Sequence, residues 1–177
     1  GDTSTNDMIS ILANGASGVD IQDEASVKQF QQVLTEVLVD LARAVARDGE
    51  GATRLITVTV TGAASEQDAL QVARTVSSSP LVKTAVHGAD ANWGRIVAAV
   101  GRAGIDLEPQ RLTVRINELA VMLPGYVSEF SEAEAAEKLS RDEVILEIDL
   151  GAGEEEATTW TCDLTSDYIA INAHYRT

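Results

Sequence analysis

The hydrophobic pattern changes its period abruptly early in the chain, and this change limits the folds that are possible. Over Glu24–Arg47, apolar residues recur at spacings of three and four, which is typical of a long amphipathic helix. Residues 55–61 (LITVTVT) then alternate with period two and are mostly β-branched, which predicts a strand. A long helix is thus followed closely by a strand, and the short segment between them turns the chain. The expected fold class is α+β.

That short segment is 47–53 (RDGEGAT), and it places the carboxylate of Glu50 between two glycines. Glycine adopts the left-handed backbone conformation at little steric cost, so Gly49 is a natural end for the helix. A carboxylate between two glycines also allows another molecule to approach the backbone closely. The local pattern therefore permits two interpretations, a helix cap with a solvated glutamate or a binding loop.

Other elements surround this turn and are separated by glycines and prolines. Ser65 is the expected cap of a helix at 65–77, and residues 81–87 (LVKTAVH) are interpreted as a strand. Strand, helix and strand at this spacing predict a crossover unit. The remaining expected elements are a strand or buried helix at 8–12, a helix at 95–100, a hairpin of strands 111–116 and 119–123 around Asn117 and Glu118, a helix at 131–139, strands at 143–150 and 157–163, and a last turn or short helix from Ser166.

The charge and the composition exclude several classes of partner. A formal net charge of -15 over 177 residues argues against nucleic acid or an anionic membrane, because phosphate groups would be repelled. Hydrophobic residues make up 45% of the chain, which is enough for a core, and no run approaches the roughly 18 apolar residues of a membrane span. Cys162 is the only cysteine, so no internal disulfide is possible, and a reducing, cytoplasmic location is expected.

The sequence contains no self-contained catalytic motif. His87 and His174 are far apart and lack a metal-binding spacing, and the acidic run 154–156 is more typical of a solvated turn. No glycine-rich phosphate loop and no activated nucleophile is recognisable, so neither a metal nor a cofactor is expected. Polar residues do gather beside glycines and at predicted strand ends, where they can converge on one pocket.

Five of these polar stretches carry a family resemblance. They are GDTSTND at 1–7, DGEGAT at 48–53, SPLVKTA at 79–85, NWGR at 92–95, and CDLTSDY with INAHYRT at 162–177. In this order, and over all 177 residues, they resemble the C-terminal part of the β chain of the ornithine acetyltransferase (glutamate N-acetyltransferase) family. A homologue from a β-lactam or clavam gene cluster would carry the same motifs, so the pathway stays open.

The resemblance implies an enzyme made from a precursor that cleaves itself at an Ala-Thr bond. The new N-terminal threonine of the β chain would be the nucleophile, with its own α-amino group as base. It would take acetyl from N-acetylornithine and pass it to glutamate in a ping-pong cycle, within an α2β2 heterotetramer. That threonine is expected upstream of Gly1, since Thr3 and Thr5 do not match the motif. No catalytic residue is therefore assigned to this segment.

The same resemblance implies the site and the domain arrangement. Glu50, Asn172 and Thr177 match the substrate-binding positions of the family, and a carboxylate at Glu50 suits the α-ammonium group of ornithine and glutamate. Residues 1–53 would complete an αββα sandwich like that of Ntn hydrolases, and residues 54–177 would form a smaller α/β module whose end returns to the active site. The alternatives are a non-catalytic module that binds an amino acid or mediates assembly, and a related amidase or aminopeptidase.

Overall fold

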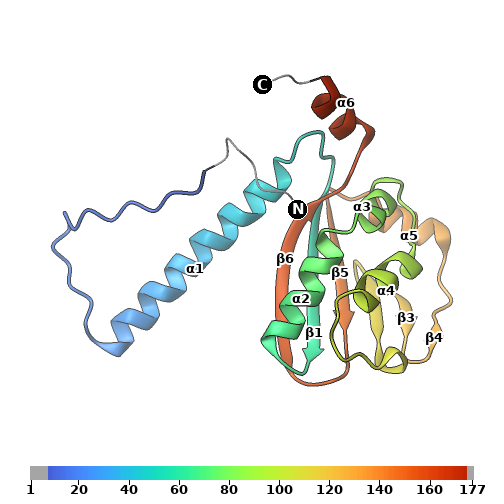
Figure 1. Cartoon of the computed structure of the whole chain (residues 1–177), viewed down its shortest axis with the longest axis horizontal. Helices are drawn as coiled ribbons and strands as arrows, with labels where there is room; N and C mark the ends of the chain where they lie inside the picture. Colours follow the sequence, from blue (N-terminus) through green and yellow to red (C-terminus); the bar gives the residue numbers. More distant parts are fainter. Residues whose placement is uncertain (1–7, 175–177) are drawn as a thin grey trace. The chain divides into compact units, whose positions relative to one another are not determined.

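The computed structural model describes residues 8–174 (Figure 1). The chain forms two compact units, one up to Leu41 and one from Ala42 onward, and each is described by itself. The predictions for the motif at 1–7 and for Thr177 fall outside the described residues. No helix among residues 8–174 combines the length and the apolar character that crossing a membrane needs.

Helix α1 (Glu24–Arg47) has the bounds predicted from the period of its apolar residues. Its first turn is capped by Asp23, whose carboxylate accepts a 2.9 Å hydrogen bond from the backbone N–H of Ser26. None of its residues is buried, and Phe30 remains 56% exposed. We call the exposed apolar side chains of this helix the α1 stripe; its members are Val27, Phe30, Val33, Val37, Leu38, Leu41 and Val45.

Residues 8–12, expected as a strand or a buried helix, form neither and are exposed. Main-chain groups of a strand need a neighbouring strand as hydrogen-bond partner, and the described residues offer none to this segment. The prediction for 8–12 is therefore wrong for the chain as described.

The second unit is built on one six-stranded sheet with the order β4-β3-β2-β5-β1-β6. β1 and β5 pair in parallel, and every other pair of neighbours is antiparallel, which confirms the α+β class. The strands are β1 (Leu55–Ala63), β2 (Thr113–Ile116), β3 (Leu119–Leu123), β4 (Tyr126–Val127), β5 (Glu143–Asp149) and β6 (Glu155–Cys162).

One face of this sheet carries the hydrophobic core. Ile56, Val58 and Val60 alternate along β1 and pack into a single cluster with residues of α2 and α4, and the helices cover this face in Figure 1. On the opposite face of the sheet, most side chains of β1, β2 and β5 are polar. The alternation predicted for β1 therefore reflects a sheet with one buried apolar face and one polar, wetter face. The helices of this unit are α2 (Glu66–Ser77), α3 (Pro80–His87), α4 (Trp93–Gly101), α5 (Glu132–Leu139) and α6 (Ser166–His174).

Residues 81–87 are helical, so the predicted strand there is wrong. Ser79 caps α3 by accepting a hydrogen bond from the N–H of Val82, and Pro80 occupies the first turn, where its missing N–H costs nothing. Val82, Ala85 and Val86 are buried, which is a helical spacing. The crossover unit therefore does not form as predicted, because the parallel neighbour of β1 is β5.

The predicted hairpin of β2 and β3 is confirmed, although its turn lacks glycine. Asn117 and Glu118 both have positive φ, at 45° and 71°, as a tight two-residue hairpin turn requires. Asn117 offsets this strain through two side-chain hydrogen bonds: it donates to the carbonyl of Lys138 and accepts from the N–H of Ile145, each at 2.7 Å.

Candidate functional site

The candidate site begins with residues 48–54, which connect α1 to β1 and which we call the Glu50 loop. The loop turns through a 2.9 Å hydrogen bond from the N–H of Ala52 to the carbonyl of Gly49, and it leaves the side chain of Glu50 exposed. Gly51 has a φ of +69°. A side chain at Gly51 would also place its Cβ 2.6 Å from the backbone nitrogen of Tyr168. Glycine is thus required there both for the backbone conformation and for the approach of another segment.

The approaching segment is residues 163–174, which follow β6 and which we call the C-terminal segment. It is anchored by Asp163, whose side chain is completely buried. The carboxylate accepts hydrogen bonds from the N–H of Thr53 at 2.7 Å, from its hydroxyl at 2.6 Å and from the N–H of Arg54 at 2.9 Å. His87 Nδ1 lies 3.0 Å away and must donate, because a carboxylate only accepts.

These contacts determine the charge state of Asp163. Burial alone raises the pKa of a carboxyl group, but the hydrogen bonds from Thr53, Arg54 and His87 outweigh this effect and hold the pKa of Asp163 below its ordinary value of 3.8. The carboxylate is therefore ionised at neutral pH, as its role of acceptor for all these donors requires. The guanidinium of Arg54, 3.8 Å from it, adds a compensating positive charge.

Thr165 makes the second connection between the two segments. Its hydroxyl donates a 2.7 Å hydrogen bond to the carbonyl of Gly51 and accepts one of 3.2 Å from the N–H of Tyr168. The second contact is that of a helix cap, so one hydroxyl both begins α6 and attaches it to the Glu50 loop. Figure 1 shows α6 beyond the end of β6, beside this loop.

Helix α6 brings Asn172 to Glu50, two residues that the sequence predicts as substrate-binding. The side-chain nitrogen of Asn172 donates to Glu50 Oε2 at 2.8 Å and to the carbonyl of Tyr168 at 2.9 Å. Both of its hydrogens are then used. Within residues 8–174, Glu50 Oε1 and Asn172 Oδ1 accept no hydrogen bond. The pair therefore presents two oxygens and one negative charge to its surroundings, which suits an ammonium group.

Sequence reasoning missed Asp163 and Thr165, although both lie in the quoted motif CDLTSDY. Their only signal is the position of polar residues directly after a strand, and such residues are usually solvated. Arg95, in the quoted motif NWGR, donates hydrogen bonds to the carbonyl of Leu81 and to the hydroxyl of Thr84, which joins α4 to α3. Among the described residues, no group of His, Cys, Asp and Glu side chains is arranged to hold a metal ion.

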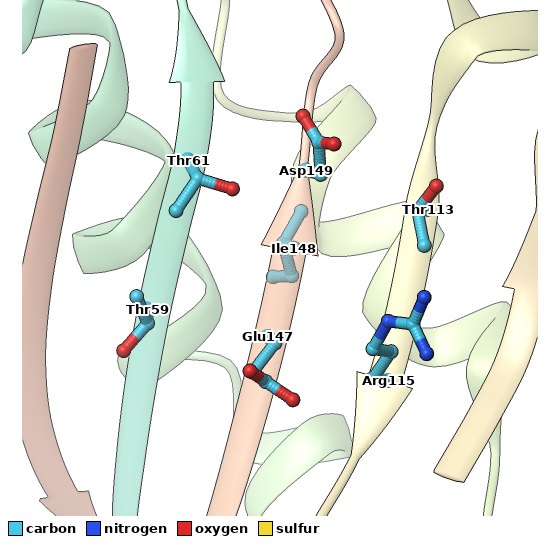
Figure 2. Close-up of a pocket in the computed structure, with 7 residues that line it drawn as sticks. All are labelled: Thr59, Thr61, Thr113, Arg115, Glu147, Ile148 and Asp149. Carbon is cyan, nitrogen blue, oxygen red and sulfur yellow. The ribbon is translucent and has the colours of Figure 1, made fainter. Parts of the chain in front are cut away.

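A separate polar hollow of about 220 Å³ lies on the wetter face of the sheet (Figure 2). Thr59, Glu147 and Arg115 lie in register there across β1, β5 and β2, and the helices of the core are behind the strands. Neither Glu50 nor Asn172 lines this hollow. Arg115 and Asp149 are exposed, so water can satisfy them, and the contact of Glu50 with Asn172 remains the better candidate site.

Comparison with known proteins gives a consistent result. The model of the ArgJ family matches residues 1–177. The arginine biosynthesis bifunctional protein ArgJ of Deinococcus radiodurans is 49% identical over 100% of this chain and 44% of its own length. The protein of that name from Symbiobacterium thermophilum is 50% identical, over 100% of this chain and 44% of its own length. A relative from Schizosaccharomyces pombe, named as mitochondrial, is 46% identical over 99% of this chain and 41% of its own length. The chain thus spans less than half of the length of these relatives.

A solved structure extends the likeness to three dimensions. The crystal structure of the arginine biosynthesis bifunctional protein argJ from Bacillus halodurans matches with a TM-score of 0.92 and 42% identity, over 99% of this chain and 84% of that one. A family match over the whole sequence and a shared fold at this identity lead to the same conclusion. The chain belongs to the ArgJ family.

Proposed function

We propose that this chain is part of the β chain of an acetyltransferase that moves the acetyl group of N-acetylornithine to glutamate. The observation that carries the proposal is the hydrogen bond between Asn172 and Glu50, which leaves one acceptor oxygen on each side chain as far as residues 8–174 are concerned. Such a pair suits the free α-amino group of ornithine as it leaves and of glutamate as it arrives. The names of the relatives, which refer to arginine biosynthesis, support this choice of substrates.

In the proposed reaction, this chain binds substrate and the reacting atoms come from elsewhere. A threonine hydroxyl of the preceding β-chain segment attacks the acetyl carbonyl of N-acetylornithine, the carbon–nitrogen bond breaks, and ornithine leaves with the proton. The α-ammonium group of glutamate first loses one proton to the α-amino group of that threonine. The resulting amine attacks the acetyl ester, the ester carbon–oxygen bond breaks, and the threonine oxygen takes the second proton of the amine. Groups of the α chain stabilise the oxyanion in both steps. Thr177 is proposed as a third substrate contact.

The partners in this proposal are the α chain of the same precursor and a second αβ pair. Residues 1–53 would complete an αββα sandwich with the α chain, and residues 54–177 would form the module that carries the C-terminal segment. The α1 stripe supports this arrangement, because a helix with so many exposed apolar side chains needs a surface that covers it. A cytoplasmic location is proposed as well.

Steady-state kinetics of the complete protein that contains this chain tests the reaction. When N-acetylornithine and glutamate are both varied, double-reciprocal plots should be parallel, and labelled acetyl should appear in N-acetylglutamate. Release of labelled acetate with glutamate unchanged would favour the amidase alternative. Binding of glutamate without turnover of N-acetylornithine would favour the non-catalytic module.

A further inference from the structure

We propose that Asp163 and Thr165 are positioning residues, which hold Glu50 and Asn172 in the geometry that binds the substrate. The inference rests on the proposed function of that pair. Neither residue is placed to touch a ligand, because Asp163 is 3% and Thr165 5% exposed. Each acts through its hydrogen bonds to the segments that carry the pair.

Thr165 closes a ring of hydrogen bonds around the site. Its hydroxyl donates to the carbonyl of Gly51, the residue after Glu50, and accepts from the N–H of Tyr168. The carbonyl of Tyr168 accepts from Asn172, which donates again to Glu50 and so completes the ring. Because Glu50 and Asn172 are exposed side chains, no surrounding packing fixes them, and their short distance depends on the backbone positions to which this ring contributes. Loss of the Thr165 hydroxyl would leave the carbonyl of Gly51 without its partner.

Asp163 controls the other end of the Glu50 loop. Its carboxylate oxygens accept from both N–H groups at 53 and 54 and from the hydroxyl of Thr53. The loop is thereby attached to the end of β6 at the point where the C-terminal segment begins. An amide in place of the carboxylate would remove the negative charge that strengthens these hydrogen bonds, and its NH2 group would no longer accept from the hydroxyl of Thr53.

Gly51 has no side chain, and this allows the two segments to approach as closely as these hydrogen bonds require. A Cβ there would lie 2.6 Å from the nitrogen of Tyr168 and 2.9 Å from the carbonyl carbon of Asp167. The first turn of α6 is thus in direct contact with the loop backbone. This leaves little freedom between the two segments, so a small displacement at Thr165 is passed on to Asn172.

The test uses Thr165→Val and Thr165→Ser in the complete enzyme, with kcat and KM measured separately. Valine keeps the shape and removes the hydroxyl, so KM for glutamate should rise about tenfold, with kcat changed less than about twofold, which corresponds to one lost hydrogen bond. Serine should restore KM. Thr159→Val is the matched control, because its hydroxyl makes a 2.6 Å hydrogen bond to Ser77 between β6 and α2, away from the site.

A double variant separates positioning from a general loss of stability. If Thr165 acts through Glu50, then Thr165→Val should add less than about a twofold change in KM to a chain that already carries Glu50→Gln. Multiplicative effects, an unchanged KM in Thr165→Val, or an equal effect of Thr159→Val would each overturn the inference. If Glu50→Gln alone leaves KM unchanged, the proposed binding role fails instead.

Amide hydrogen exchange gives a readout that is independent of activity. Thr165→Val and Asp163→Asn should each speed exchange in peptides covering 48–54 and 166–174. Glu143→Gln, which removes a carboxylate bound to Arg43 and Thr57, should not affect those peptides. Unchanged exchange in the folded Thr165→Val protein would contradict the positioning role whatever the kinetics show.

Discussion

The side-chain amide of Asn172 donates a 2.8 Å hydrogen bond to the carboxylate of Glu50, which lies 122 residues earlier in the chain. The two residues belong to different motifs, and the ring through Thr165 and Tyr168 brings them together. Three measurements follow from this geometry and from the hydrogen bonds of Asp163, and a fourth tests the α1 stripe.

Glu50→Gln and Asn172→Ala should weaken substrate binding more than they change turnover. Glutamine removes the negative charge that attracts an ammonium group, and a lost charged hydrogen bond is worth about 1.5–3 kcal/mol, so KM for glutamate should rise roughly tenfold to a hundredfold. Glu137→Gln is the matched control, since Glu137 is an exposed glutamate on α5. Equal KM values for the Glu50→Gln and Glu137→Gln enzymes would show that Glu50 does not bind the substrate.

Gly51→Ala should destabilise the chain more than an alanine at another glycine of positive φ. Gly104 has a φ of +76° and nothing within 4 Å of a built Cβ, so Gly104→Ala should cost only the left-handed conformation, about 1–2 kcal/mol. Gly51→Ala adds the clash with the backbone of Tyr168, for which a further 1–3 kcal/mol is expected, roughly the cost of overpacking. Denaturant unfolding of both variants measures the difference. Equal losses would show that the close approach of α6 does not constrain Gly51.

Asp163→Asn should make the acid dependence of stability weaker. The pKa of Asp163 is lower in the folded chain than its ordinary value of 3.8, so its carboxylate stabilises the folded state above that value. This contribution is lost as the pH falls from 3.8 through the folded pKa. The free energy of unfolding should therefore differ between wild type and Asp163→Asn by about 2 kcal/mol at neutral pH, and the difference should shrink below about pH 4.

The control for this pH dependence is Glu137→Gln, an exposed change that leaves the network of Asp163 intact. Urea unfolding curves at several pH values for the three proteins give the comparison. A difference between wild type and Asp163→Asn that stays constant down to the most acidic pH would contradict the assignment of the low pKa to this network.

Charged residues in the α1 stripe should prevent assembly with the rest of the protein. Phe30→Glu would place a carboxylate where the proposed partner surface covers an apolar ring, whereas Gln31→Glu adds the same charge at a neighbouring position outside the stripe. Size-exclusion chromatography with light scattering should show dissociated chains for Phe30→Glu and the wild-type assembly for Gln31→Glu. Normal assembly of Phe30→Glu would show that this part of the stripe is not an interface.

Local sequence determined most of the elements, because their causes lie within a few residues of each other. The spacing of apolar residues defines α1, and the side chains of Asp23 and Ser65 accept backbone hydrogen bonds at the starts of α1 and α2. The segment 81–87 shows where local reasoning fails: its β-branched residues at every second position, Val82, Thr84 and Val86, favour a strand, but the cap at Ser79 and Pro80 in the first turn favour a helix. Burial of Val82, Ala85 and Val86 on one side decided between them.

The motifs in the sequence also pointed to Glu50 and Asn172, because a glycine-flanked carboxylate and a family pattern are visible in the printed residues. Only the tertiary structure decided that these two side chains meet. It also decided that Asp163 and Thr165 are buried. Their partners in the Glu50 loop lie 110 and 114 residues earlier in the chain, so local sequence could not predict this burial. The sequence of a polar residue after a strand is the same whether its hydrogen-bond partners are water molecules or protein groups. Long-range packing determines which of the two it is.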